Sequence, residues 1–85
     1  MNEVFLIGKI VNKVDFNFVI NSKRNFSKVE FELAVQKQKI KIIGYNEIAD
    51  YCYQNLELNE IIQLNGKLET NGRIRIQDVE KYSKY

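Results

Sequence analysis

An alternating apolar pattern in the first twenty residues constrains the fold of this chain more than any other feature. Through residues 2–20 the even positions are mostly apolar and the odd positions mostly polar. Side chains alternate across a strand, so the pattern predicts one continuous strand, although strands usually have about 5–6 residues. Gly8 lies inside this run, and a glycine or bulge allows a strand to bend. A strand that bends in this way can serve both halves of a closed barrel.

Four more strands follow from the same alternation. Residues 21–26 are mostly polar and predict a loop, and the alternating runs after it predict strands at 27–36, 39–44, 59–69 and 72–82. Asn71-Gly72 separates two of these runs and predicts a tight type I′ turn. Asn65-Gly66 lies within a run, so Gly66 is expected to mark a bend or a bulge.

One helix is expected over residues 46–54, where the period of the apolar residues changes. Ile48, Cys52 and Leu56 follow one another at intervals of four residues, which places them on one stripe of a helix. Asn46 is the expected N-cap. Cys52 lies on the buried stripe, and we expect it to be a small core residue and not a reactive thiol.

The order of these elements predicts the fold class. Three strands, a helix and two further strands make an all-β domain with one helix between strands three and four. This is the pattern of the five-stranded OB-fold, a partly open Greek-key barrel. The chain has 85 residues, so we expect a single domain that covers residues 1–85.

Composition argues against catalysis. The chain has no His and a single Cys, so an internal disulfide is excluded, and neither a zinc site nor a His-based general base is expected. Glu30 and Glu32 have no nucleophile, metal ligand or glycine-rich phosphate loop near them in the sequence. We expect no enzymatic activity, no cofactor and no metal. No apolar run approaches the roughly 20 residues that span a membrane, and no secretory signal opens the chain, so the cytoplasm is the expected location.

Charge is distributed unevenly along the chain, although the formal net charge is only +2. Residues 23–41 contain six bases and two acids, whereas residues 47–60 contain four acids and no base. This asymmetry indicates either a basic side that attracts a polyanion or two ordinary solvated surfaces.

Several segments resemble bacterial single-stranded DNA-binding proteins. The first, second and last strands of that family are similar to NEVFLIGKI, FELAV and IRIQDVEKY in this chain. The third strand, helix and fourth strand are similar to IIGYNEIADYCYQNLELNEIIQLNGKLET, with its Gly after strand three and its Gly-Lys-Leu at the end of strand four. The resemblance covers nearly the whole chain. It implies an OB-fold, single-stranded DNA as the ligand, and dimers that pair their first strands.

Three departures from the family pattern point to its shorter members. The chain has no Trp, and Ile43 stands where the family commonly has a Phe before the glycine. The last hairpin, usually long enough to wrap DNA, is reduced to residues 70–72. The acidic tail that recruits partner proteins is missing, which makes primosomal single-strand-binding subunits or accessory proteins of plasmids and phages the closer likeness.

Candidate nucleic-acid contacts are basic or aromatic residues, because single-strand binders need cations for phosphates and flat side chains for bases. In the first loop, Phe26 either stacks on a base or folds back over the barrel mouth. Lys39 and Lys41 either contact phosphate or pair across the hairpin with two acids, Glu30 and Glu32. The full set of expected contacts is Lys23, Arg24, Phe26, Lys39, Lys41, Tyr45, Arg73 and Arg75.

Apolar residues of the first strand fall on both of its faces. By period alone, Phe16 and Phe18 are expected in the core. The outer phase carries Phe5, Ile7 and Val11. These side chains either lie under the helix or form a subunit contact, and we predict a homodimer or homotetramer through this strand.

The sequence therefore predicts a small OB-fold protein that binds single-stranded DNA without strong sequence preference, with RNA as the alternative ligand. Replication, recombination and plasmid or phage DNA transfer are the processes in which such binding is expected. The alternative is a protein-interaction module of the same fold that has lost nucleic-acid binding, which the missing Trp and the short last hairpin favour.

Overall fold

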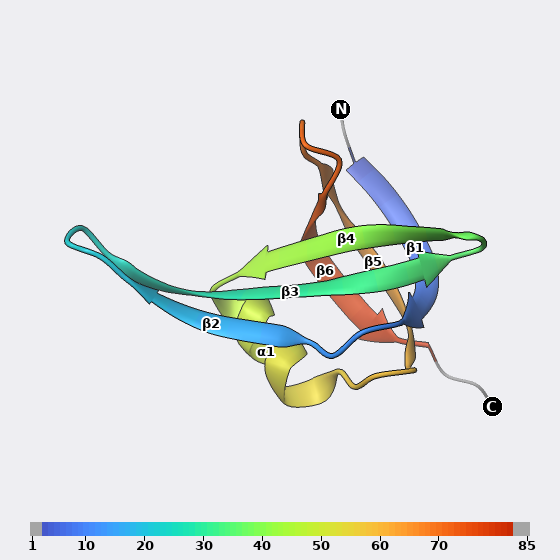
Figure 1. Ribbon diagram of the computed structural model, residues 1–85, viewed down its shortest axis with the longest axis horizontal. Helices are drawn as coiled ribbons and strands as arrows, with labels where there is room; N and C mark the ends of the chain where they lie inside the picture. Colours follow the sequence, from blue (N-terminus) through green and yellow to red (C-terminus); the bar gives the residue numbers. More distant parts are fainter. Residues whose placement is uncertain (1–2, 83–85) are drawn as a thin grey trace.

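The computed structural model describes residues 3–82 and folds them into strands and one helix (Figure 1). In chain order the elements are β1 (Glu3–Ile10), β2 (Asp15–Ile20), β3 (Asn25–Val35), β4 (Gln38–Tyr45), α1 (Glu47–Asn55), β5 (Ile61–Leu68) and β6 (Ile74–Lys81). The helix and the last four strands lie within two residues of their predicted bounds. In this part of the chain no helix has the length and apolar character needed to cross a membrane.

The strands close into a barrel. Their order in the sheet is β1-β5-β6-β4-β3-β2, and an additional pairing of β1 with β3 joins the sheet to itself. The β4–β6 pairing is parallel and short, whereas the other pairings are antiparallel. The ring of β1, β5, β6, β4 and β3 is the five-stranded barrel of the OB-fold, so the predicted fold class is confirmed. The helix lies between β4 and β5, because the predicted first strand is divided into β1 and β2.

The prediction of one continuous strand over residues 2–20 is wrong. Strand β1 ends at Ile10 and β2 begins at Asp15, and both pair with β3. Four residues, 11–14, stand opposite only two residues of β3, 31 and 32. The side chain of Asn12 fills the break, because its Oδ1 accepts the N–H of Glu32 at 2.7 Å in place of a backbone carbonyl. Asn2, where the predicted strand begins, lies outside the described residues.

Gly8 lies where β1 passes from β5 to β3. It pairs with Ile62 on β5, and the next residues of β1 pair with β3. A Cβ atom built on Gly8 would lie 2.5 Å from the carbonyl oxygen of Ala34 and 2.9 Å from Cγ of Leu33. The glycine is therefore required by the close approach of β3, at the place where the sequence predicted a bend.

The barrel is filled by apolar side chains from every strand of the ring and is covered at one end by α1. Ala49 and Cys52 on the helix are fully buried in this core, as the helical stripe predicted for Cys52. Burial raises the pKa of the Cys52 thiol to about 12, so the side chain remains neutral. The core has a single contiguous cluster: Ile10, Val29, Phe31, Leu33, Ile42, Ala49, Cys52, Leu56, Ile62, Leu64, Ile74, Ile76 and Val79.

The start of α1 is fixed by Ser27 of β3. Asn46 occupies the N-cap position, as predicted, but with φ 60° its side chain makes no capping hydrogen bond. Instead the backbone N–H of Asn46 donates to the Ser27 carbonyl at 2.9 Å. The buried Ser27 hydroxyl donates to Oδ1 of Asp50 at 2.9 Å. Helix α1 is thereby held against the base of the β2–β3 hairpin.

Strands β2 and β3 extend beyond the barrel as a long hairpin, drawn at the left of Figure 1. The hairpin lies along the longest of the principal extents of 44 × 29 × 18 Å. Its loop has only residues 21–24, because Phe26 belongs to β3 and not to the predicted loop. Phe16 packs against the core as predicted. The core prediction for Phe18 is wrong, since this residue is 60% exposed where the hairpin has left the barrel.

Two predictions about Asn-Gly pairs have different outcomes. The register of β5 on β6 shifts between Asn65 and Gly66, so the expected bulge is confirmed. The predicted type I′ turn at residues 71–72 is wrong. The N–H of Gly72 donates to the Glu69 carbonyl at 2.9 Å, and only Gly72 in this turn has a positive φ, at 88°. A type I′ turn needs positive φ at both central residues, whereas this turn has a single left-handed residue, Gly72, after its two central residues.

Candidate nucleic-acid interface

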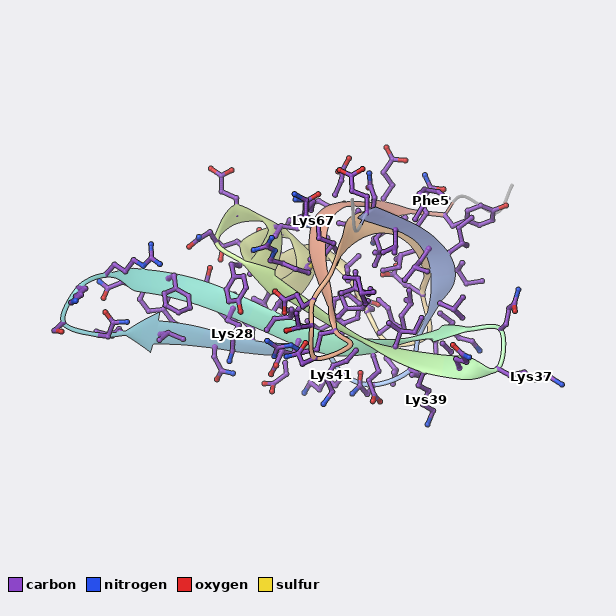
Figure 2. The ribbon with its side chains drawn as sticks, turned by 90° about the horizontal axis from the view of Figure 1, so that it is seen from above. Phe5, Lys28, Lys37, Lys39, Lys41 and Lys67 are labelled. Atoms are coloured by element: carbon purple, nitrogen blue, oxygen red, sulfur yellow. The ribbon has the colours of Figure 1, made fainter. Side chains whose placement is uncertain are left out.

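The outer face of β3 and β4 carries two of the six basic residues of the predicted site, Lys39 and Lys41, together with Lys28. Alternate residues of a strand share a face, and the register places Lys28 opposite Tyr45 and Glu32 opposite Lys41 on this outer face. Figure 2 shows Lys28, Lys41 and Lys39 spaced along one side of the molecule, with Lys67 and Phe5 on the opposite side. The outer face of β3 and β4 is therefore a candidate track for a polyanion.

An aromatic pair stands on this face where the β2–β3 hairpin extends past the end of β4. The rings of Phe26 and Tyr45 meet edge to face, with centroids 5.9 Å apart and an interplanar angle of 64°. Both side chains are half-buried. This contact gives a partial answer to the alternatives for Phe26: its ring packs on Tyr45 outside the barrel and is absent from the core cluster. The accessible part of such an aromatic pair offers a stacking surface to an unpaired base.

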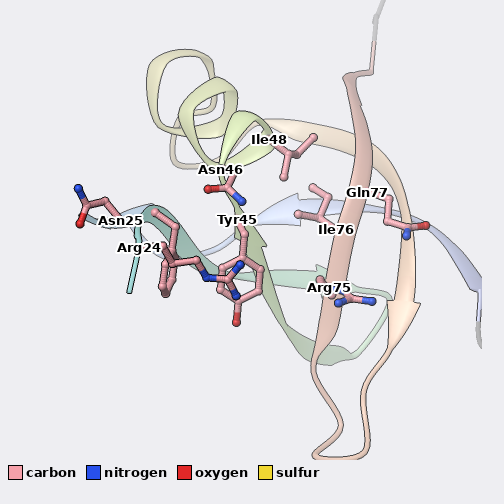
Figure 3. A pocket seen from close by; sticks show the side chains of 9 residues that line it. Arg24, Asn25, Tyr45, Asn46, Ile48, Arg75, Ile76 and Gln77 are labelled. Atoms are coloured by element: carbon pink, nitrogen blue, oxygen red, sulfur yellow. The ribbon is translucent and has the colours of Figure 1, made fainter. Parts of the chain in front are cut away.

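The aromatic pair forms one wall of a hollow of about 670 Å³ between the hairpin and β6 (Figure 3). Ile48 and Ile76 contribute apolar surface to it. Figure 3 shows Arg24 beside Tyr45 on one side and Arg75 on β6 on the other, with the Arg75 side chain directed away from Arg24. This volume is within the usual range for ligand sites. The hollow is lined by Arg24, Asn25, Phe26, Tyr45, Asn46, Ile48, Arg75, Ile76 and Gln77.

The hairpin loop is ordered by its own hydrogen bonds. Oδ1 of Asn21 accepts the backbone N–H groups of Lys23 at 2.8 Å and of Arg24 at 2.9 Å. Such a side-chain turn closes the loop and fixes the backbone of its two basic residues. Arg24 lines the hollow, whereas Lys23 is exposed at the tip of the hairpin and does not line it.

Arg73, which directly precedes β6, and Arg75 within it have the same phase but different surroundings. The guanidinium of Arg73 lies 3.6 Å from the carboxylate of Glu30 and 3.3 Å from that of Glu69, and its Nε is buried without a hydrogen bond among the described residues. Arg75 lies 4.0 Å from Glu69, at the limit of an ion pair, and its side chain is 45% exposed against 28% for Arg73. Arg75 is the more accessible cation for a phosphate.

Lys39 and Lys41 lie outside the hollow. Lys41 borders a smaller depression that also contains Asp15, Glu30 and Glu32. The predicted cross-strand pairing with acids holds in register for Lys41, which stands opposite Glu32, but Lys39 stands opposite Ala34. Between residues 3 and 82, neither lysine has a carboxylate within 4.0 Å. This part of the outer face is more acidic than the hollow.

Sequence reasoning identified four residues of the hollow and missed the rest. Arg24, Phe26, Tyr45 and Arg75 are brought together as predicted contacts. Gln77 continues the outward phase of Arg75, so its place could have been found from periodicity. No local signal marks the remaining residues, because the hairpin and the end of β4 meet only in the folded chain: Asn25, Asn46, Ile48 and Ile76.

The outer residues of β1 form a separate apolar strip. Phe5 is 61% exposed and Ile7 44% exposed, whereas Val11 is half-buried. The register places Phe5 opposite Asn65 and Ile7 opposite Gln63 on β5, so neither side chain lies under the helix. On its other side β1 pairs with β3 only at Lys9 and Ile10, which leaves its earlier part as an open edge among the described strands.

Solved structures with the same fold come from three bacteria. The SSB domain of a Synechococcus protein is similar with a TM-score of 0.80 and 16% identity, over 93% of each chain. The single-stranded DNA-binding protein of Thermus aquaticus matches with a TM-score of 0.86 and 18% identity, over all of this chain and 42% of that one. The second such protein of Mycobacterium smegmatis matches with a TM-score of 0.81 and 14% identity, over 96% of this chain and 87% of that one.

The chain has the fold of bacterial single-stranded DNA-binding domains. The resemblance seen in the sequence is thus confirmed at the level of the fold. No family model matches the chain, and no curated protein matches it. At 14–18% identity the structural likeness establishes architecture, and a shared architecture does not fix a function.

Proposed function

We propose that this chain binds single-stranded DNA with little sequence preference. The observation that carries the proposal is the Phe26–Tyr45 pair, flanked by Arg24 and Arg75 in one hollow. Stacking platforms accept any base, because every base has a π-face, and cations beside them hold the phosphates. The similar structures named above are single-stranded DNA-binding proteins, which supports the same ligand class for this fold.

In this account the sugar–phosphate backbone of the bound DNA follows the basic residues of the outer face. Arg24 and Arg75 hold phosphates on either side of a base stacked on the aromatic pair, and Lys28 lies beside that pair, opposite Tyr45. The acids around Lys41 repel phosphate and offset part of this attraction. Binding is therefore expected to depend on a few cations and to be of modest salt sensitivity.

Assembly through β1 is part of the proposal. The exposed side chains of Phe5 and Ile7 lie beside an open strand edge, and Val11 continues the same phase. A second copy that pairs with this edge would satisfy its backbone groups and cover the apolar strip. A homodimer or homotetramer would then present several hollows to one DNA strand. We propose that such binding serves replication, recombination or plasmid or phage DNA transfer.

One observation favours a second function, that of a protein-interaction module. Arg73 is held by two acids, and Lys41 shares a depression with Asp15, Glu30 and Glu32, so two of the six predicted basic residues lie beside acids. Titration with thymidine, adenosine and cytidine oligomers of about thirty nucleotides, and with a duplex, separates the functions. Similar affinity for the three oligomers and weak duplex binding support the proposal, and no binding to any of them at low salt supports the interaction module.

A further inference from the structure

The apolar face of β2 continues past the end of the barrel. Phe16 is half-buried and stacks on Tyr53 of α1, with ring centroids 4.5 Å apart and an interplanar angle of 26°. Phe18 and Ile20 lie on the same phase of the strand but are 60% and 72% exposed. Together with Tyr53, which is 58% exposed, these residues form the back patch: Phe16, Phe18, Ile20 and Tyr53. The patch is on the face of the hairpin opposite Phe26, because Phe26 pairs with Val19.

Acids and bases border the back patch at different ends. Ser27 is the cross-strand partner of Phe18 and donates its hydroxyl to Asp50, so a carboxylate lies beside Phe18. Glu47 is in the same first turn of α1, which contains no base. At the other end, the loop that follows Ile20 carries Lys23 and is exposed. Figure 1 shows the helix, strand β2 and the hairpin loop following one another along the hairpin. Their charges make this order acidic, apolar and basic.

We infer that two copies of this chain pack their hairpins back to back through the back patch. A two-fold axis near Ile20 sets the hairpins antiparallel, and residue 18 of one copy then stands beside residue 22 of the other. The basic loop of each copy lies next to Asp50 and Glu47 of its neighbour, while the apolar residues cover one another. The patch is complementary to itself, which is the condition for an isologous contact.

This contact uses other residues than the β1 strip and other residues than the aromatic pair. Phe26 and Tyr45 are on the face of the hairpin opposite the back patch, whereas Arg24 and Asn25 line the hollow at the edge of the contact. The contact also gives the apolar residues of the protruding strand a role, since Phe18 and Ile20 have no core behind them.

Cross-linking at the proposed axis tests this contact directly. Ile20→Cys places two thiols close together in the pair, and diamide takes up two electrons and two protons as they join in a disulfide. The native Cys52 is fully buried and does not compete. Leu58→Cys is the matched control, because Leu58 is also exposed and lies outside the patch. We expect disulfide-linked dimers at least about tenfold faster for Ile20→Cys. Equal rates for the two variants would overturn the inference.

Self-association measured by sedimentation gives a second test. Ile20→Ser should weaken association by about tenfold or more, since truncation of a central apolar contact has effects of this size. Lys23→Glu should also weaken it, and Lys23→Glu combined with Glu47→Lys should restore it. Phe5→Ser in the same background removes any contribution of the β1 strip. A wild-type protein that stays monomeric at millimolar concentration would contradict the back-to-back contact. Association of Ile20→Ser and Lys23→Glu as strong as that of the wild type would contradict it too.

Discussion

The rings of Phe26 and Tyr45 meet edge to face, 5.9 Å between centroids, on the outer face of adjacent antiparallel strands. The contact joins the outer part of the β2–β3 hairpin to the end of β4 and creates one wall of the hollow between the hairpin and β6. Arg24 and Arg75 flank it. The proposed binding of a single strand depends on this arrangement, and its parts can be removed one at a time.

Phe26→Ala should weaken oligonucleotide binding by about 1–3 kcal/mol, the usual contribution of one base stacked on an aromatic ring. Stacking releases no counterions, so the dependence of affinity on salt should stay unchanged. Fluorescence anisotropy with a labelled thymidine oligomer at several salt concentrations measures both quantities. Tyr51→Ala removes an exposed aromatic ring from α1 and serves as the control, with wild-type affinity expected.

Arg75→Ala should weaken binding to all oligonucleotides alike and reduce the salt slope by about 0.7, the effect of one lost phosphate contact on a single strand. The contrast with Lys37→Ala is informative, because Lys37 is exposed at the far turn between β3 and β4, away from the hollow. Lys37→Ala should leave the slope close to that of the wild type. Equal slopes for the Arg75 and Lys37 variants would remove Arg75 from the site.

Gly8→Ala should destabilise the barrel. The added Cβ meets the backbone oxygen of Ala34 at 2.5 Å, and β1 or β3 must shift to admit it. Overpacking of this kind costs about 1–3 kcal/mol of unfolding free energy. Urea unfolding followed by circular dichroism measures the change. Gly72→Asn is a suitable comparison, because Gly72 has open space around it and Asn tolerates its positive φ, so a smaller loss is expected.

The Cys52 thiol should resist alkylation in the folded protein. Burial raises its pKa from 9.0 to about 12, so the unfolded chain loses this proton at lower pH than the folded one. The stabilisation is complete below pH 9 and is lost as pH rises towards about 12. Mass spectrometry after iodoacetamide treatment should show labelling in urea and almost none without it. Cys52→Ala should flatten the fall of the unfolding free energy above pH 9. Rapid labelling of the folded protein would contradict this burial.

Periodicity identified the strands but could not show where the first one breaks. At the interruption, four residues between β1 and β2 lie opposite two residues of β3, so the chain has two extra residues there. Because this number is even, the inward-facing phase continues unchanged from Ile10 to Phe16. The alternation therefore looks continuous in the sequence. Periodicity also assigns Phe18 to a face without showing whether a core lies behind it, and the hairpin leaves the barrel before that point.

The candidate site was predictable in its residue types more than in its pairings. Arg73 and Arg75 have the same phase in the sequence at the start of β6, and only the fold brings Glu30 from β3 against Arg73. The sequence likewise gave no sign that Asn46, with its positive φ, would line the hollow next to Tyr45. Contacts between distant segments decide which predicted cations remain accessible.

The most direct test of the central claim is the affinity for a thymidine oligomer of about thirty nucleotides, measured over a tenfold range of salt. We predict a log–log slope of about −2 to −3, because three or four cations can reach the phosphates and neighbouring acids offset some of the others. The dissociation constant should then rise by about 100- to 1,000-fold across that range. No binding at the lowest salt, or an affinity that does not change with salt, would contradict the account.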